Sequence, residues 1–377
     1  MVANTTEQET ELIDAAVAWL GDYLPPGWTA ERSERQIGGP NSSQPSRVDA
    51  VVDLRGSNAT ATFAVEAKRS FAPRDVERLL PGLSRTLRSL AGNVPLLVVA
   101  PWLSARTQEL LRDEGINYID LTGNVFIRLD FPAVFIRTTG ATRNPEPQTR
   151  EVARLRGPKA GRLVRTLIDV RPPYGVRELA GATRLAPGYV SRLLDALDRD
   201  ALVDRSPKGV VLAVDFAALL RRWTESYDVL TSNETRRFIA PEGAGRSFER
   251  LRDLAATGAI SVTGSFAAVR LAPVAAPALL LLYVEDMAKV IDGLNLLPAD
   301  EGANVVLLRP FDQVVWDRVD RDDGITYVAP SQAAADCLTG TGRMPSEGEA
   351  LITWMTANED RWRVPSLRAL VETEPRT

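Results

Sequence analysis

The chain has 377 residues, of which 45% are apolar and 25% charged, proportions typical of a soluble globular protein with two or three domains. It contains no histidine and one cysteine, Cys337, which excludes Ser-His-Asp hydrolases, histidine-bound metalloenzymes, cysteine-rich zinc sites and an intramolecular disulfide. The polar N-terminus and the absence of a long apolar run predict a cytoplasmic protein without a membrane partner. Any hydrolytic chemistry would depend on carboxylates, lysine and a hard metal such as Mg²⁺.

Residues 1–140 are predicted to form one α/β domain with a mixed sheet. Apolar side chains at helical spacing predict a helix over Thr6–Leu24, which ends at a Pro-Pro-Gly sequence. Further helices and strands alternate after it: strands Arg47–Leu54 and Thr60–Lys68, helix Arg74–Leu90, strand Pro95–Ala100, helix Ser104–Glu114, and strands Asn117–Leu121 and Val125–Leu129. This order predicts a sheet flanked by helices.

The first two of these strands read as a hairpin that carries charged residues. If the turn is centred near Ser57, antiparallel pairing places Asp49 opposite Glu66 on one face. Lys68 shares that face because strand side chains alternate. Two carboxylates can bind Mg²⁺, and an ammonium group can neutralise charge in phosphodiester hydrolysis. The spacing therefore predicts a metal site at Asp49 and Glu66 with Lys68 as a further catalytic residue; Asp53 would replace Asp49 if the register slipped by four.

These strands, "VDAVVDL" and "FAVEAK", resemble the PD-(D/E)xK nuclease superfamily. The resemblance implies a restriction-endonuclease-like fold for residues 1–140 and catalytic positions for Asp49, Glu66 and Lys68. Members often add a glutamate from the first helix, for which Glu9 and Glu11 are both candidates. The superfamily also includes members that bind DNA without cutting it, so we expect Mg²⁺ as a cofactor only if the site is active, and no cofactor otherwise.

A polar, proline-containing linker, residues 140–148, leads to a mainly helical block, residues 150–225. Its predicted elements are a helix around Leu163–Ile168, a helix Val176–Thr183, a helix that begins at Pro187, and strands Leu202–Arg205 and Val210–Val214. This order is typical of a winged helix-turn-helix, in which the second helix of the pair enters the DNA major groove. Residues 151–225 carry 14 Lys and Arg against 9 Asp and Glu, which favours an anionic partner.

The helix from Pro187 has apolar residues at Val190, Leu193, Leu194 and Leu197, which we expect to face the core. The predicted DNA-contacting residues lie on the preceding turn, the outward side of this helix, and the strand pair: Arg184, Tyr189, Ser191, Arg192, Arg205 and Lys208. The stretch "YVSRLLDALDRDALVDRSPKGVVLAV" resembles the recognition helix and wing of many bacterial winged-helix regulators. The alternatives are a solvated basic face and a helical domain that docks another protein.

Residues 226–377 are predicted to form an α+β accessory domain. Its predicted elements are helix Arg246–Thr257, strands Ile260–Leu271 and Ala278–Val284, helix Met287–Leu294 and strand Asn304–Leu308. Gly264-Ser265 followed by Glu285-Asp286 is faintly similar to the signature of nucleotidyltransferases, which need alternating carboxylates. Adjacent carboxylates would point to opposite faces of a strand, so a regulatory or dimerisation role is predicted instead.

The stretch "EGINYIDLTGNVFIRL", followed by the winged-helix block and the last block, resembles proteins grouped with AbiE-type antitoxins. That resemblance implies a winged-helix transcriptional regulator that represses its own operon, with a cognate toxin protein as partner. The leading hypothesis is a sequence-specific regulator of double-stranded DNA, with a homodimer left open. The rivals are a Mg²⁺-dependent endonuclease aimed by its winged helix, and a protein-interaction scaffold.

Overall fold

The computed structural model describes residues 2–33, 48–56, 59–76, 94–142, 144–145, 155–254 and 259–373. The chain divides into two compact units: Met1–Glu151 with Arg199–Ala201, and Val152–Asp198 with Leu202–Thr377. Each unit contains one mixed seven-stranded sheet. The expected class, a multidomain protein of mixed α/β structure, is therefore confirmed. The blocks 150–225 and 226–377, predicted separately, are grouped almost entirely in the second unit.

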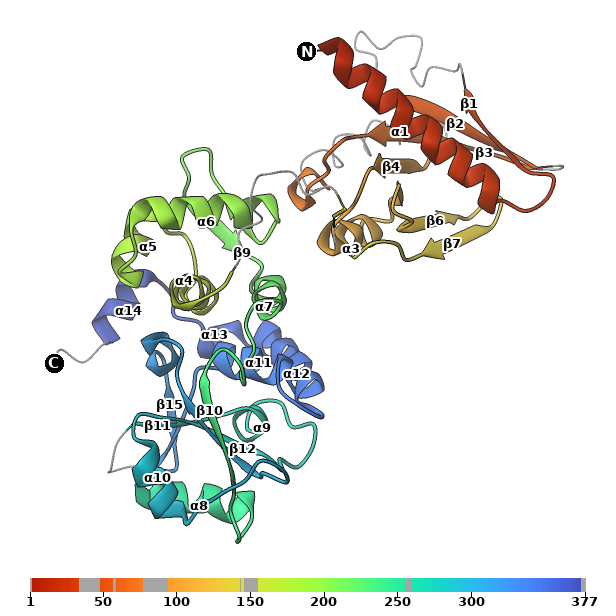
Figure 1. Cartoon of the computed structure of the whole chain (residues 1–377). Helices are drawn as coiled ribbons and strands as arrows, with labels where there is room; N and C mark the ends of the chain where they lie inside the picture. The colour runs from red at the N-terminus through yellow and green to blue at the C-terminus, as the bar shows by residue number, and fades with distance from the viewer. Residues whose placement is uncertain are drawn as a thin grey trace. The chain divides into compact units, whose positions relative to one another are not determined.

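The sheet of the first unit follows the chain order from β1 to β7 (Figure 1). Its strands are β1 (Thr29–Ser33), β2 (Ala50–Arg55), β3 (Thr60–Ala67), β4 (Leu96–Ala100), β5 (Asn117–Asp120), β6 (Val125–Leu129) and β7 (Val134–Thr138). The central strands β3, β4 and β5 are parallel, and the outer pairs are antiparallel. The ends of β3, β4 and β5 therefore meet at one edge of the sheet.

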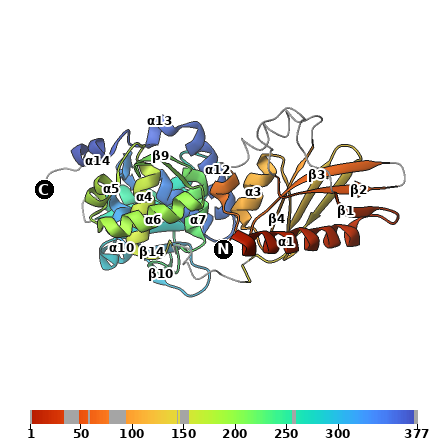
Figure 2. The same ribbon diagram turned by 90° about the horizontal axis from the view of Figure 1, so that it is seen from above.

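Helices cover both faces of this sheet (Figure 2). Helix α1 (Val2–Tyr23) buries Leu12, Ile13, Ala16 and Leu20 against one face. Helix α3 (Ala105–Asp113) packs on the other and begins at Ser104, whose side chain accepts a hydrogen bond from the amide of residue 107. Because β4 is covered on both sides, all five of its residues are buried, as its unbroken apolar sequence predicts.

The edge strands of this sheet were not predicted. Strand β1 has the sequence TAERS, whose polar residues are mostly exposed, and β7 alternates between half-buried and exposed positions. Neither strand carries the run of buried apolar residues that marks the centre of a sheet. The predicted helix Arg74–Leu90 falls largely outside the described residues.

The second unit begins with three helices and a two-stranded antiparallel sheet. These elements are α4 (Pro158–Asp169), α5 (Val176–Thr183), α6 (Pro187–Arg199), β8 (Val203–Arg205) and β9 (Val211–Val214), followed by α7 (Phe216–Thr224). The predicted apolar stripe of α6 is confirmed, since Val190, Leu193, Leu194 and Leu197 are all buried. Helix α7 was not predicted; Asp215 caps it, and Trp223 is buried in the core.

The second sheet has the order β13-β10-β14-β12-β11-β16-β15. Its strands are β10 (Glu234–Ile239), β11 (Ile260–Thr263), β12 (Leu280–Val284), β13 (Leu297–Pro298), β14 (Val305–Arg309), β15 (Asp320–Asp322) and β16 (Ile325–Tyr327). The accompanying helices are α8 (Ala244–Leu254), α9 (Ser265–Ala268), α10 (Met287–Leu294), η1 (Gln313–Trp316), α11 (Pro330–Leu338), α12 (Met344–Ala357), α13 (Glu359–Trp362) and α14 (Leu367–Thr373).

The predicted strand Ile260–Leu271 is wrong beyond Thr263. Gly264 adopts a φ of +63°, a conformation that favours glycine, and the chain turns there into the buried helix α9. Thr263 pairs with Leu281, whereas Ile260 pairs with Val284. The Gly-Ser turn and the carboxylates after β12 therefore lie at opposite ends of this strand pair, and do not come together as in the nucleotidyltransferase signature.

A buried polar chain joins α4 to the core beside the second sheet. The Arg165 guanidinium forms an ion pair with Asp169 at 3.1 Å and donates to Gln332 Oε1 at 2.6 Å. From the other side, Arg318 pairs with the same Asp169 carboxylate at 2.6 Å. The Gln332 amide group then donates to Asp336 at 2.8 Å. Residues from the two predicted blocks thus share one hydrogen-bonded core.

Candidate functional site

The predicted hairpin register is confirmed. Ala50 pairs with Val65, which places Asp49 opposite Glu66 at the end of the β2–β3 pair. The backbone amide of Ala67 donates to Asp49 Oδ2 at 2.9 Å, and Lys68 Nζ lies 3.3 Å from Glu66 Oε1. Two carboxylates and one ammonium group are therefore gathered at the sheet edge where β3 ends.

The Glu66 carboxyl group is in an environment that favours its protonated form. Its side chain is only 12% exposed. Burial and the nearby charge of Asp49 raise the pKa of Glu66, and these effects outweigh the ion pair with Lys68, which lowers it. Glu9 on α1 adds a smaller contribution that also raises this pKa. A bound cation would stabilise the ionised form of two carboxylates that lie this close together.

The structure distinguishes between the residues that the sequence left as alternatives. Asp53 pairs in register with Thr62, is buried, and accepts a hydrogen bond from the Thr62 hydroxyl at 2.7 Å. It is therefore not the cross-strand partner of Glu66. On α1, Glu9 is half-buried and its charge acts on Glu66, whereas Glu11 is exposed.

This cluster offers two carboxylates, Asp49 and Glu66, as possible metal ligands. Among the residues that the structure describes, no group of three or more Asp, Glu or Cys side chains is arranged to bind a metal ion. Mg²⁺ commonly keeps several water ligands and takes one or two protein carboxylates together with phosphate oxygens. Asp49 and Glu66 fit that mode of binding.

Asp120, within the stretch "EGINYIDLTGNVFIRL", has a structural role. It is fully buried at the end of β5. Its oxygens accept hydrogen bonds from the amides of Leu103, Thr122 and Asn124 and from the side chains of the last two. Five donors on one carboxylate fix the loop between β5 and β6, and leave little capacity for a ligand.

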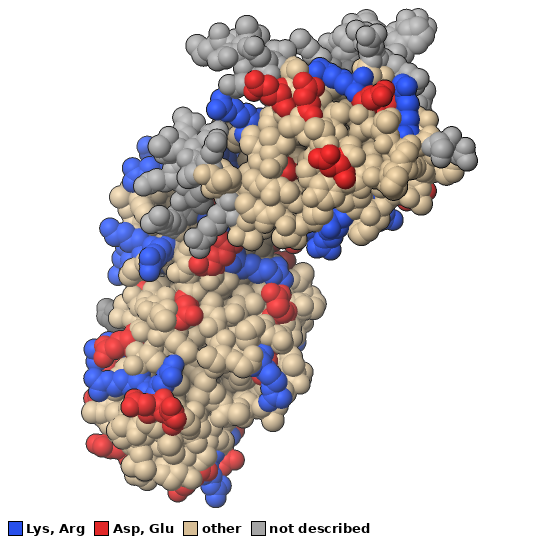
Figure 3. All heavy atoms as spheres, turned by 45° about the vertical axis from the view of Figure 1, so that its right-hand side comes forward, with Lys and Arg blue, Asp and Glu red and all other residues tan. Residues whose placement is uncertain are grey.

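The second cluster of predicted residues lies on α6 and the turns around it. Arg184 ends α5 with a φ of +54°, and its side chain is exposed, as are those of Arg192 on α6 and Lys208 between β8 and β9. Within the described part of the chain none of these three cations forms an ion pair. Figure 3 shows several Lys and Arg side chains gathered at the end of this unit where α5 and α6 lie in Figure 1.

The other three predicted contacts are less accessible. Tyr189 and Ser191 are half-buried, and burial raises the pKa of the Tyr189 phenol. The Arg205 guanidinium pairs with Asp195 at 2.5 Å and also donates to Gly209 O at 3.4 Å. This pair joins α6 to the β8–β9 turn, so Arg205 positions the turn. Nothing in the local sequence pattern indicates a pair ten residues apart.

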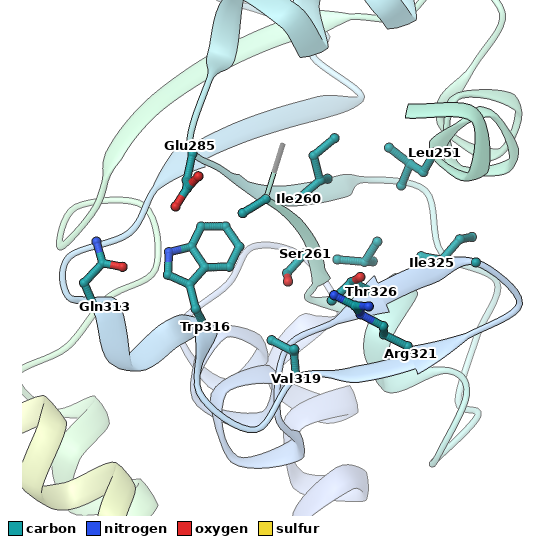
Figure 4. Close-up of a pocket in the computed structure, with 13 residues that line it drawn as sticks. Leu251, Ile260, Ser261, Glu285, Gln313, Trp316, Val319, Arg321, Ile325 and Thr326 are labelled. Carbon is teal, nitrogen blue, oxygen red and sulfur yellow. The ribbon is translucent and has the colours of Figure 1, made fainter. Parts of the chain in front are cut away.

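A separate cavity of about 470 Å³ opens in the second unit, between β11 and the segment that contains η1 and β15 (Figure 4). Its walls include Ile260, Val262 and Ile325, with Glu285 and Arg321 on opposite sides. This cavity contains none of the residues predicted to contact DNA or metal.

Part of the chain matches a known protein family. No curated protein matches the chain. Among the described residues, no helix combines the length and the apolar character needed to cross a membrane. Residues 213–347, which run from the end of β9 into α12, match the family model described as "Transcriptional regulator, AbiEi antitoxin, Type IV TA system".

Proposed function

We propose that this chain is a sequence-specific, double-stranded DNA-binding transcriptional regulator of the antitoxin type. The family match over residues 213–347 supports a regulator or antitoxin role and makes a cognate toxin protein the expected partner. Residues 150–225 are proposed to be its winged helix-turn-helix. The order α4, α5, α6, β8 and β9 is the order of that motif.

The observation that carries this proposal is a set of exposed cations on α6 and on the turns around it that form no ion pair with a described residue. The apolar stripe of α6 packs into the core, which leaves Arg192 exposed on the opposite side. An arginine there can donate two hydrogen bonds to a guanine edge in the major groove. Arg184 and Lys208, on the turns before and after α6, are proposed to contact phosphates.

Replacing Arg192 with alanine is expected to weaken specific binding by about tenfold or more, because a bidentate base contact contributes roughly 1–3 kcal/mol. Lys208→Ala should weaken binding to all sequences about equally. It should also make the slope of log affinity against log salt concentration shallower by about one. Fluorescence anisotropy with a duplex from the region upstream of the protein's own coding sequence, and with a duplex of scrambled sequence, measures both effects.

Arg246→Ala is the matched control, since Arg246 is an exposed arginine of the same unit, on α8, with an ion pair to Glu249. It should leave both affinities unchanged. Equal losses in Arg192→Ala and Arg246→Ala would contradict the proposed recognition surface. If the wild-type protein binds neither duplex, that result would favour the hypothesis of a protein-interaction scaffold.

A second candidate function rests on the Asp49, Glu66 and Lys68 cluster, which we propose as a Mg²⁺-dependent endonuclease site in a restriction-endonuclease-like fold. Bound Mg²⁺ would polarise the scissile phosphate and acidify its own water ligand. Asp49 and Glu66 would hold the ion, and Lys68 would neutralise charge on the phosphate in the transition state. Since the pKa of Glu66 is raised, the carboxylate needed for metal binding forms at a higher pH than that of an ordinary glutamate.

Under this alternative, the wild-type protein nicks supercoiled plasmid in Mg²⁺, and activity increases with pH as Glu66 loses its proton. Lys68→Ala is expected to lower the nicking rate by about 100-fold or more, the usual range for a positioned catalytic group. Glu9→Gln should lower the pKa of Glu66 and so raise the nicking rate at low pH, whereas Glu11→Gln should leave the rate unchanged, because of these two residues only Glu9 contributes to the field at Glu66. Nicking that persists in Lys68→Ala would count against the site.

A further inference from the structure

The hairpin of β6 and β7 presents aromatic and cationic side chains on one exposed face. Alternate residues of the two strands, Val125, Ile127, Leu129, Val134 and Ile136, pack toward the α1 side of the sheet. The residues between them point to the opposite face, and these are Phe126, Arg128, Phe135 and Arg137. The hairpin lies at the edge of the sheet, where β7 has no further strand neighbour among the described residues.

The register arranges these four side chains in an alternating pattern. Phe126 pairs with Arg137, and Arg128 pairs with Phe135, so each ring has an arginine both beside it and across from it. The Phe126 and Phe135 ring centroids are 6.0 Å apart in an edge-to-face contact. On the neighbouring strand, Tyr118 stacks on Phe126, also at 6.0 Å. A row of three rings therefore crosses β5, β6 and β7.

The rings at β7 and the hairpin tip are exposed, whereas Phe126 is half-buried and Tyr118 is buried. The Phe135 side chain is 67% exposed, and Phe131, at the tip of the hairpin, is 86% exposed. Burying such rings is normally favourable by about 25 cal/mol per Å² of apolar surface, so their exposure indicates a binding surface. Asp130, also exposed, is the acidic residue of the tip.

The charge of the face identifies the kind of partner. Arg128 and Arg137 are exposed, and neither forms an ion pair with a described residue. Arg112 of α3 adds a third guanidinium beside the row of rings, where it donates to the Tyr118 hydroxyl at 2.9 Å. Guanidinium groups attract phosphates, while exposed rings offer stacking surfaces that tolerate any base. A protein partner would use the apolar surface but leave these cations uncompensated unless it were acidic.

We propose that the β6–β7 hairpin is a binding platform for single-stranded nucleic acid. Bases stack on Phe126, Phe135 and Phe131, and Arg128 and Arg137 contact the sugar-phosphate backbone. The platform belongs to the first unit and is independent of the proposed duplex-binding surface of the second unit. The platform requires unpaired bases, because in a duplex the faces of the bases are already stacked on one another.

The test measures anisotropy of fluorescein-labelled oligothymidylate and oligouridylate of about 16 nucleotides, within the site size of single-strand binding domains. Wild-type protein should bind, with affinity that falls as salt increases. Phe135→Ala and Arg128→Ala should each weaken binding by about tenfold. Phe135→Trp should retain binding, whereas Phe135→Leu, which keeps apolar surface but removes the ring, should lose it. The two oligonucleotides distinguish DNA from RNA as the preferred strand.

Two variants serve as controls. Tyr23→Ala removes a 55% exposed ring of the same unit, on α1 at the other face of the sheet, and should leave oligonucleotide binding unchanged. Arg192→Ala should weaken duplex binding and leave oligonucleotide binding intact, which separates this proposal from the proposed regulator function. Circular dichroism and the melting temperature verify that each variant is folded.

Three results would overturn the platform. The first is wild-type protein that does not bind either oligonucleotide. The second is Phe135→Leu that binds as tightly as wild type, since stacking would then be irrelevant. The third is a change in oligomeric state in Phe131→Ser or Phe135→Ala with unchanged oligonucleotide affinity, which would identify the face as an interface between copies of the chain.

Discussion

Replacing Arg165 with methionine is expected to lower the free energy of unfolding of the second unit by about 3–5 kcal/mol. The Arg165 side chain is 0% exposed, and it pairs with an Asp169 carboxylate that is equally inaccessible. Burial alone would raise the pKa of Asp169, but the charges of Arg165 and Arg318 outweigh burial and lower it. Removing one guanidinium leaves a buried negative charge half-compensated and leaves Gln332 Oε1 without its donor.

For a unit of this size, such a loss corresponds to a decrease in melting temperature of roughly 10 °C. Differential scanning calorimetry measures it, and the transition of the first unit serves as an internal reference because that unit is unchanged. Arg221→Met is the matched control. Arg221 forms a comparable ion pair with Glu349 at 2.7 Å, but both side chains are about half exposed, so its loss should cost less than about 1 kcal/mol. Equal effects of the two substitutions would contradict the importance of burial.

Local patterns in the sequence predicted the elements that lie at the centre of each unit. The stripe from Val190 to Leu197 and the apolar run of β4 are each buried as expected, because a side chain's face follows directly from helix or strand geometry. The register around Asp49 and Glu66 was also predictable, since a short turn fixes how a hairpin pairs.

Other features depend on contacts that no local pattern contains. Arg165 and Gln332 are 167 residues apart, and their hydrogen bond is one reason why two predicted blocks share a core. The edge strands β1 and β7 lack the apolar runs by which a buried strand is recognised. The strand predicted through Gly264 was wrong because a positive φ at one glycine redirects the chain, and the apolar residues after it are buried in a helix instead.

Substituting Asp336 with asparagine is expected to change how the stability of the second unit depends on pH. Burial raises the pKa of Asp336 to about 6, although four hydrogen bonds to the carboxylate act in the opposite direction. These come from Thr263, Tyr227, Gln332 and Tyr283, at 2.6, 2.6, 2.8 and 3.0 Å respectively. The folded protein therefore holds the proton of this carboxyl group more tightly than the unfolded chain does.

A carboxyl group with a raised pKa stabilises the folded state fully below its unfolded pKa, near 4, and this contribution is lost as pH rises through about 6. The difference of about two pH units corresponds to roughly 3 kcal/mol, as an order of magnitude. Wild-type protein should thus lose stability between pH 4 and 7.5 relative to Asp336→Asn, which does not titrate. The phenols of Tyr227 and Tyr283 remain neutral throughout, since burial raises the pKa of each well above its usual value.

Urea unfolding of both proteins at a series of pH values measures this effect as a difference, in which all other titrating groups cancel. Asparagine presents an amide donor to neighbours that are themselves donors, so the variant should be less stable than wild type at low pH. Because asparagine does not titrate, this loss of hydrogen bonding is the same at every pH. As pH rises, the gap should narrow, because the wild-type protein alone must ionise a buried group. A constant gap would mean that the pKa of Asp336 is the same in the folded and unfolded states, and a gap that widens toward pH 7.5 would mean that the hydrogen bonds stabilise the carboxylate more than burial penalises it.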